Sequence, residues 1–348
     1  METKKIMTDM GEVELLEYVP DFYIGICDKA NEILPILRKA IPNWTSADVC
    51  KKMNISLWVY NSTLTNAFAQ KCDDANYIAL SVGLLQSFWN AANEFVYHEN
   101  FHKVIKLADE NKPGFIDNIF LSMVIFIVAH EFGHIAHGHL LYNNSGNFVT
   151  EYMSSRRKLT PEENLREQMK EFDADNVAAD ISFALNIYGA LEKNDTRYLK
   201  SHIDALYIAT YLVFRTLAEK KKRDYDSYFE KDIDSYDHPY PGLRMFYTNI
   251  FYAAWIIDNN LDVGLIQSGT HVVMAYEKQV LDKKEYKEGF YAIGQTKRGT
   301  DHVKLIMNGW RSMVSKYNRH AYIHIQRKEF IDTLPYSLTE DGDFIPIK

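Results

Sequence analysis

The sequence predicts a mostly helical α+β fold with one small sheet near its N-terminal end. Strand-like runs gather within residues 55–82, whereas apolar side chains after that point recur mainly at helical spacing. Residues 119–129 are apolar on every side, so a helix there must be buried. A chain of 348 residues is long enough for one large domain or two small ones. We expect a single domain, 1–348, with its core at about 55–260 and helical extensions at 1–50 and 261–348.

The first third of the chain is expected to hold two helices, then the sheet and a third helix. Residues 55–60 alternate Ile, Leu and Val with Ser, Trp and Tyr, which is typical of a strand. A polar turn at 71–74 would join two further strands as a hairpin. Lys112-Pro113-Gly114 indicates a break before the long apolar helix. The expected helices are 12–18, 24–40 and 83–94, and the expected strands are 55–60, 65–70 and 76–82.

The second half of the chain is expected to be almost wholly helical. Polar residues 143–147 end the apolar helix and introduce a loop. Thr160, Pro161 and Glu163 then match a helix start, with Thr as the N-cap, Pro in the first turn and Glu placed for a capping box. Apolar spacing extends this helix to about residue 188. Later helices are expected at 198–221, 243–258, 271–282 and 301–317, followed by a short strand at 321–326.

The composition is that of an ordinary globular protein and argues against several partners. The chain is 47% hydrophobic and 25% charged, and its formal net charge of −8 argues against nucleic acid. Three Cys residues are too few for a disulfide framework or a Cys-based zinc site, so we expect a reducing, cytoplasmic location. The N-terminus lacks the apolar core of a signal peptide, and no run reaches the roughly 20 apolar residues of a membrane span.

The chemistry is expected at the end of the long apolar helix, where the sequence reads His130-Glu131-Phe132-Gly133-His134. Residues four apart share a helix face, so both imidazoles can hold one metal ion. Glu131 lies on the adjoining face, where its carboxylate can accept a proton from a water at the ion's open coordination position. This His-Glu-x-x-His pattern is typical of zinc hydrolases.

A third protein ligand is expected from a second helix, because catalytic zinc usually has three protein ligands and a water. Glu171 and Asp175 share a face of the helix that follows the loop. Glu171 can complete the shell of a single zinc ion, and Asp175 can accept the free N–H of a ligand histidine. A solvated acidic turn is the alternative interpretation. The rival ligands are Glu163, Glu167 and Asp173, with Glu167 the strongest because it lies one turn earlier on nearly the same face.

Other histidines are given structural interpretations on the residues alone. His137 is expected to be exposed or to cap the helix, and His139 to pack or hydrogen-bond at the helix end. His98 and His102 lie four apart but have no accompanying carboxylate base, so we expect them to be structural. His238 precedes Pro239 and is interpreted as a turn residue.

Four motifs together resemble the gluzincin metallopeptidases of the CAAX-prenyl-protease and heat-shock membrane-protease group. They occur in the same chain order and cover about residues 55–244. The motifs are His130-Glu131-x-x-His134 followed by His139; Glu171-x-x-x-Asp175; Asn66-Ala67-Phe68-Ala69 with Tyr77-Ile78-Ala79-Leu80 and Gly83-Leu84-Leu85; and His238-Pro239 followed by Arg244. The absence of membrane spans departs from this group. In that respect and in its aromatic content the chain is similar to soluble Lit-type phage-exclusion peptidases.

The resemblance implies a zincin-like core and a role for each matched residue. His130, His134 and Glu171 would bind one Zn²⁺, Glu131 would be the general base, and Asp175 would orient a ligand. His238 or Arg244 would lie at the cleft and stabilise the oxyanion, or His238 would cap the metal in a resting state. The strand formed by Tyr77, Ile78, Ala79 and Leu80 would offer its edge to an extended peptide.

The sequence therefore predicts a zinc-dependent endopeptidase whose partner is a protein or peptide substrate. One alternative is a zinc-stabilised protein-interaction module without turnover. Another is a latent host-directed protease in phage defence. An intact Glu131 favours the enzyme, because a purely structural site has no use for a base at that position.

Overall fold

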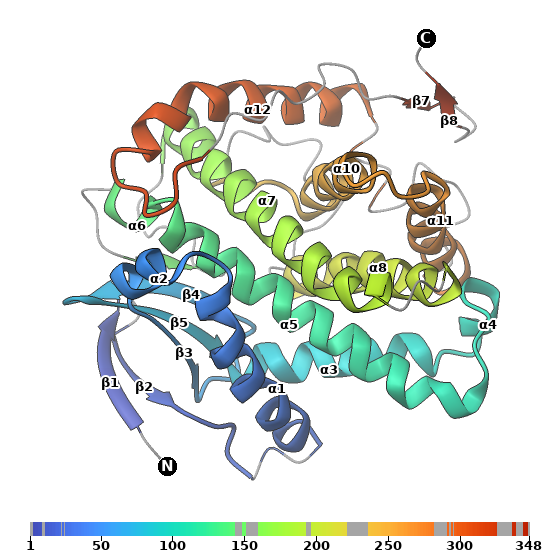
Figure 1. The fold of residues 1–348 in the computed structure, drawn as a ribbon, viewed down its shortest axis with the longest axis horizontal. Coiled ribbons are helices and arrows are strands. Elements are labelled where there is room, and N and C mark those ends of the chain that lie inside the picture. Colours follow the sequence, from blue (N-terminus) through green and yellow to red (C-terminus); the bar gives the residue numbers. More distant parts are fainter. Residues whose placement is uncertain are drawn as a thin grey trace.

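Helices and a curled sheet form the computed structural model, with the sheet gathered at one end (Figure 1). Helices α5 (Lys112–Ala136) and α7 (Pro161–Glu192) run side by side through the middle. The structure describes residues 3–8, 11–21, 23, 25–142, 148–150, 159–192, 196–220, 236–281, 291, 294, 296–325, 336–338 and 344–346.

The main sheet has six strands in the order β1-β2-β3-β5-β4-β6. All neighbouring strands are antiparallel except β3 and β5, which are parallel. Five strands come from the first 81 residues, and the sixth is added by a segment that follows α5. The strands are β1 (Thr3–Thr8), β2 (Gly11–Leu16), β3 (Ile55–Tyr60), β4 (Ala67–Cys72), β5 (Ala75–Ser81) and β6 (Phe148–Thr150).

Three strands match the prediction, and the first residues do not. β3, β4 and β5 lie where expected, and Asp73, with a φ of 53°, makes the hairpin turn in the left-handed region. The helix expected at 12–18 is wrong, because Glu12 and Glu14 face solvent while Leu15 is buried, which is the two-residue period of a strand. The described part of residues 1–50 therefore begins with the hairpin β1–β2, which joins the sheet through β3. Helices follow at 27–40, close to the predicted 24–40, and from residue 47.

The remaining elements are mostly helices. Ile41–Asn43 and Asp109–Asn111 are short 3₁₀ turns, and the strands β7 (Tyr336–Leu338) and β8 (Phe344–Pro346) form a separate pair. The helices other than α5 and α7 are α1 (Cys27–Ala40), α2 (Ala47–Met53), α3 (Val82–Val96), α4 (Phe101–Val104), α6 (His139–Tyr142), α8 (Thr196–Lys220), α10 (Pro241–Asp258), α11 (Gly264–Gln279) and α12 (Lys297–Tyr317).

A predicted helix boundary and a predicted strand are wrong. The expected break at Pro113 lies inside the first turn of α5, where a proline is tolerated because its missing N–H has no helical partner there. The strand expected at 321–326 is absent over 321–325, and residue 326 lies outside the described residues. The backbone N–H groups of Tyr322 and Ile323 instead donate to the carbonyl oxygen of Ala136, at the end of α5.

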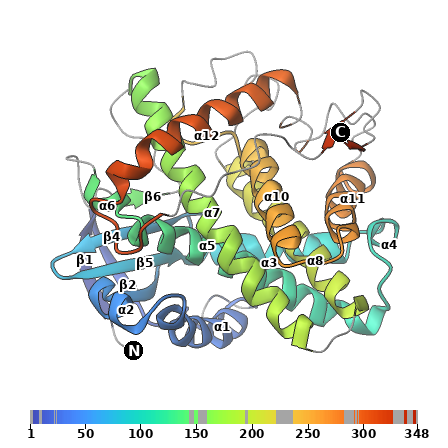
Figure 2. The same cartoon turned by 45° about the horizontal axis from the view of Figure 1, so that its top comes forward.

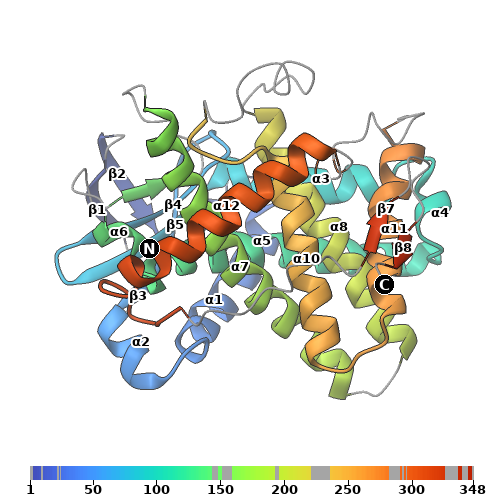
Figure 3. The same cartoon turned by 90° about the horizontal axis from the view of Figure 1, so that it is seen from above.

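Helix α5 is the core of the helical layer. The helical stretch 109–136 contains a window long and apolar enough to cross a membrane, but 94% of that window is buried inside the protein. Helices α3, α7 and α8 pack against α5, and α10 and α12 pack on α7 (Figures 2 and 3). The apolar run is thus accounted for by burial against other helices, as predicted for residues 119–129.

Helix α7 begins at a complete capping box. The Thr160 N–H donates to Glu163 Oε2 (2.8 Å), and the Glu163 N–H donates to Thr160 Oγ1 (3.2 Å). These reciprocal bonds satisfy two backbone donors that a helix N-terminus otherwise leaves unpaired. The sequence prediction of this helix start is confirmed.

The two central helices are in close contact where α5 carries Gly133. A Cβ at Gly133 would lie 3.1 Å from Ala174 Cα and 3.1 Å from Val177 Cβ, both in α7. Only a residue without a side chain fits this contact without displacement. The glycine of the His-Glu-x-x-His motif therefore sets the distance between the two helices.

We expect Gly133→Val to destabilise the protein by about 1–3 kcal/mol, because the added methyl groups overpack the contact between α5 and α7. Denaturant unfolding of the metal-free protein measures this change. Gly114→Ala is the matched control, since a Cβ there meets nothing within 4 Å. The control should be neutral or slightly stabilising, because alanine favours helix over glycine. Equal stability of the two variants would contradict a tight contact at Gly133.

Candidate metal centre

Three side chains from the two central helices bring their donor atoms together. His130 Nε2 and His134 Nε2, one turn apart on α5, lie 3.0 Å from each other. Glu171 on α7 places Oε2 3.4 Å from His130 Nε2 and Oε1 3.4 Å from His134 Nε2. These residues form a buried group that could hold a metal ion.

The spacing of these side chains is compatible with a bound metal ion. Ligands at roughly 2.0–2.1 Å from a tetrahedral zinc ion lie about 3.3–3.4 Å from one another. The two imidazole nitrogens are 3.0 Å apart, and each lies 3.4 Å from a different oxygen of the Glu171 carboxylate. Two imidazoles and one carboxylate are also a donor set that zinc commonly takes. The residues present therefore fit a metal ion.

The Glu171 carboxylate is held in its charged form. Burial alone would raise the pKa of Glu171, but the neighbouring imidazoles of His238, His130 and His134, where they are protonated in the absence of a metal ion, outweigh burial. The resulting pKa lies well below the usual range. An ionised carboxylate is the form that binds a cation.

The outer nitrogen of His130 is fixed by Asp175. His130 Nδ1 donates to Asp175 Oδ1 (2.9 Å), which leaves Nε2 with its lone pair toward the centre. Asp175 also accepts two bonds from the Arg244 guanidinium (both 2.8 Å) and one from the Tyr247 hydroxyl (2.6 Å). The structure thus places Asp175 where the sequence predicted it. Tyr247 was missed, although it lies one helical turn after Arg244 on α10.

Arg244 lies beside the carboxylates. Its guanidinium binds Asp175 through both oxygens, lies 3.5 Å from Glu171 Oε2, and stacks 4.9 Å from the Phe214 ring. These contacts hold two acidic side chains in position. They favour a positioning role for Arg244 over donation to an oxyanion.

His238 comes next to Glu171 from the segment that precedes α10. Its Nε2 lies 3.7 Å from Glu171 Oε1, and its Nδ1 donates to Asp237 Oδ1 (2.9 Å). The side chain is buried. Its interpretation as a plain turn residue is therefore too limited, because the imidazole faces the candidate ligands.

Glu131 follows His130 on α5 and is fully buried. Burial raises the pKa of Tyr60, at the end of β3, to about 12, and the charge of Glu131 adds a smaller contribution. The Glu131 carboxylate is therefore within electrostatic reach of this strand end, whereas Glu171 approaches the histidines from α7.

The rival third ligands are engaged elsewhere. Glu163 caps α7, and Glu167 accepts two bonds from Lys170 Nζ (2.9 and 3.0 Å). Asp173 is buried but approaches His137 and His139 in place of the His130–His134 pair. Of the four acidic residues considered, Glu171 is the one at the donor cluster.

His137 and His139 are both buried. His137 is the C-cap of α5 and donates from Nδ1 to Asp173 Oδ2 (2.6 Å), so the expected capping position holds and the alternative of an exposed residue is wrong. Burial is the main cause that lowers the pKa of His139 to about 3, so this imidazole is neutral. Its hydrogen-bonding role at the helix end was predicted. Trp310 on α12, which also donates to Asp173 (2.7 Å), was missed because no local pattern links it to the motif.

The expected peptide-binding edge is wrong. Residues Tyr77, Ile78, Ala79 and Leu80 lie in β5, which pairs with β3 along one edge and with β4 along the other. A strand bonded on both sides has no edge for a further strand. The hairpin was predicted, but its position inside the sheet depends on the parallel pairing with β3.

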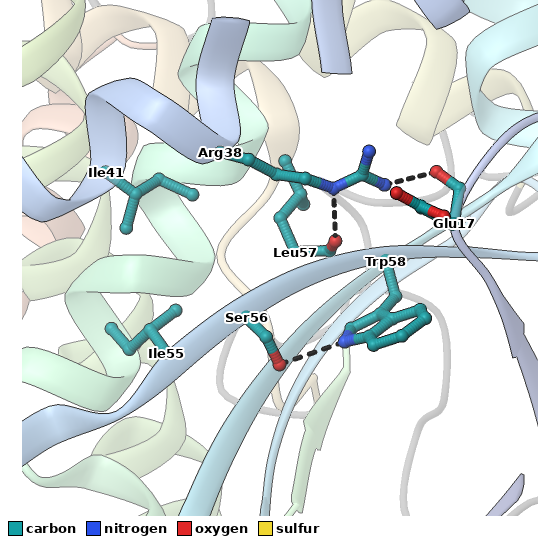
Figure 4. Close-up of a pocket in the computed structure, with 7 residues that line it drawn as sticks. All are labelled: Glu17, Arg38, Ile41, Ile55, Ser56, Leu57 and Trp58. Atoms are coloured by element: carbon teal, nitrogen blue, oxygen red, sulfur yellow. Dashed lines mark hydrogen bonds between the residues drawn. The ribbon is translucent and has the colours of Figure 1, made fainter. Parts of the chain in front are cut away.

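A cavity of about 250 Å³ lies apart from the histidine cluster, between α1 and β3 (Figure 4). Arg38 crosses it and donates to the carbonyl oxygens of Leu57 (2.9 Å) and Glu17, while Trp58 donates to Ser56. Its lining contains neither histidine nor cysteine. The metal donors of the described residues therefore gather at the histidine cluster and not at this cavity.

Comparison of the chain with models of protein families, with curated proteins and with solved structures finds no match. The assignment of this centre therefore rests on its own geometry: a buried His130, His134 and Glu171 group that could hold a metal ion.

Proposed function

We propose that this protein is a zinc-dependent endopeptidase acting on a protein or peptide substrate. The supporting observation is the buried group of His130, His134 and Glu171, together with an additional carboxylate, Glu131, beside the first histidine. A structural zinc site needs ligands alone, whereas a hydrolytic site also needs a base at the open position. We further propose a cytoplasmic location, from the low cysteine content.

Each residue has a defined part in the proposed reaction. A zinc ion bound there would polarise the peptide carbonyl and lower the pKa of water. Glu131 would accept the proton of the attacking water and return it to the amine leaving group. Asp175, held by Arg244 and Tyr247, would keep His130 in the tautomer that presents Nε2 as a ligand.

His238 has a more specific role in this proposal. Because Nδ1 donates to Asp237, neutral His238 presents the lone pair of Nε2 toward Glu171. A lone pair suits a fourth metal ligand, whereas only the protonated imidazole would donate to an oxyanion. The geometry of the neutral side chain therefore favours the resting-state cap over oxyanion stabilisation.

Burial of the centre favours the second candidate, a zinc-stabilised interaction module. His130 and His134 are fully buried and Glu171 is 4% exposed, as at closed structural sites. The same burial fits a latent protease whose site opens only when triggered. The enzyme and the module differ in whether Glu131 matters for turnover, and the following two variants separate them.

We expect Glu131→Gln to retain zinc and lose proteolysis. The amide cannot accept the water proton, and loss of a general base costs about 10²–10⁴-fold in rate. The measurement combines zinc analysis with mass-spectrometric counting of new peptide termini in a cell lysate, with and without chelator. If the wild type holds zinc and generates no chelator-sensitive termini under any condition, the interaction module is the better assignment. Wild-type cleavage by the variant would remove Glu131 from the mechanism.

We expect Glu171→Ala to lower zinc affinity by about 10-fold or more, because it removes one of three protein donors. Glu167→Ala is the matched control on the same helix, since Glu167 binds Lys170 and not the histidines. Competition with a chromophoric chelator measures both affinities. Equal affinities of the two variants would show that Glu171 is not a ligand.

A further inference from the structure

The outer nitrogen of the second histidine of the motif has a partner outside the motif. His134 Nδ1 lies 2.9 Å from His139 Nδ1. Both imidazoles are fully buried, and the two rings meet edge to face with their centroids 5.1 Å apart. At this distance one of the two nitrogens carries a proton and the other a lone pair, whereas the two Nε2 lone pairs of His130 and His134 would be shared with the bound ion.

The environment of His139 Nε2 indicates whether His134 Nδ1 or His139 Nδ1 carries the proton. His139 Nε2 lies 3.0 Å from Asp173 Oδ2, and Asp173 is fully buried. Asp173 also accepts from His137 Nδ1 (2.6 Å) and from Trp310 Nε1 (2.7 Å). This contact lacks the angle of a hydrogen bond, but a lone pair facing a carboxylate oxygen at 3.0 Å would be repelled, so we assign the hydrogen of neutral His139 to Nε2. Neutral His139 then has its lone pair on Nδ1, which accepts the proton of His134 Nδ1.

The chain of donors ends at the candidate metal centre. A proton on His134 Nδ1 leaves the lone pair on Nε2, which faces His130 and Glu171. Asp175 performs the same task for His130 directly. The acceptor for His134 is the neutral imidazole of His139, whose other nitrogen lies beside the Asp173 carboxylate.

The local backbone explains how His139 reaches back to His134. Gly138 has a φ of 74°, a left-handed conformation that ends α5 and reverses the chain. A Cβ at Gly138 would lie 2.5 Å from the backbone of His320, so the segment after α12 packs directly on the turn. Tyr317 of α12 meets the His139 ring edge to face at 4.9 Å. Helix α12 therefore supports both His139 and Asp173.

We propose that His139 and Asp173 are positioning residues for His134, and that Trp310 of α12 fixes Asp173 in this role. This inference rests on the proposed zinc site, whose ligand would be His134. It gives the C-terminal region around α12 a function in assembling the centre. In the sequence this region had only the assignment of a helical extension.

The test compares two substitutions of His139 with opposite properties. Asn keeps a polar atom near the position of Nδ1 and can accept from His134, whereas Leu fills the space without an acceptor. Apo-protein is titrated with Zn²⁺ against a chromophoric chelator. We expect His139→Leu to weaken zinc binding about 10- to 100-fold and His139→Asn to bind closer to the wild type. A role in packing alone predicts the reverse order, because Leu preserves apolar contacts better than Asn.

The matched controls are His271→Leu and His271→Asn on the exposed face of α11, which should leave zinc affinity unchanged. Wild-type affinity in both His139 variants would overturn the inference and leave the proposed function standing. Failure of the wild type to bind zinc would overturn both.

A measurement on the wild type covers the case in which His139→Leu does not fold. Long-range ¹H–¹⁵N correlation of the zinc-loaded protein, labelled at histidine, distinguishes the two neutral tautomers. We expect His139 to be protonated at Nε2 and bare at Nδ1, with His134 protonated at Nδ1. A proton on His139 Nδ1 would contradict the proposed direction of the chain.

Discussion

The close contact between α5 and α7 is the constraint on which the candidate centre depends. Helix α5 supplies apolar surface and imidazoles, and α7 supplies carboxylates. Glu171 can reach both histidine nitrogens only because Gly133 leaves no side chain between α5 and the backbone of Ala174. The glycine in the motif is therefore as much a condition of the site as the histidines.

Electrostatics supplies a second argument for a cation. Four carboxylates are buried in this region: Glu131, Glu171, Asp173 and Asp175. Among the described residues, Arg244 is the guanidinium that binds them, at Asp175 and beside Glu171. Burying an uncompensated charge is costly, so a surplus of negative charge is offset by protons, on the histidines or on a carboxyl group, or by a bound cation. A divalent ion held by His130, His134 and Glu171 would compensate much of it.

The sequence could predict the parts of the fold that local periodicity determines. A few neighbouring residues are enough to predict an element in three cases: the apolar run of α5, the alternation of β3 and the capping box at Thr160. The prediction of a helix at 12–18 failed because Leu and Glu are good helix formers. The pairing of this segment with β1 and β3 depends on tertiary contacts that its local sequence does not show. The position of β5 inside the sheet was hidden for the same reason.

In the candidate site, too, local spacing could predict some residues and tertiary contacts determine the others. His130, Glu131, His134, Glu171 and Asp175 could be identified because their spacing on helices carries the chemistry. The alternation of faces on α7 could not show that Asp173, two residues after Glu171, turns toward His137 and His139. That outcome depends on the turn at Gly138 and on α12, more than 130 residues away in the chain.

The two ligand histidines consequently depend on different parts of the molecule. His130 is fixed by Asp175 and the Arg244 and Tyr247 side chains of α10. His134 is approached by His139, next to Asp173 and Trp310 of α12. Helix α12 also reaches the segment that carries His238, since His302 bonds Gln168 Oε1 (2.7 Å) and Gln168 donates to the Tyr236 carbonyl oxygen (2.7 Å). A displacement of α12 would therefore disturb His134 and His238 together, and it would reach the partners of His130 less directly, because Phe172 packs against both Trp310 and Tyr247.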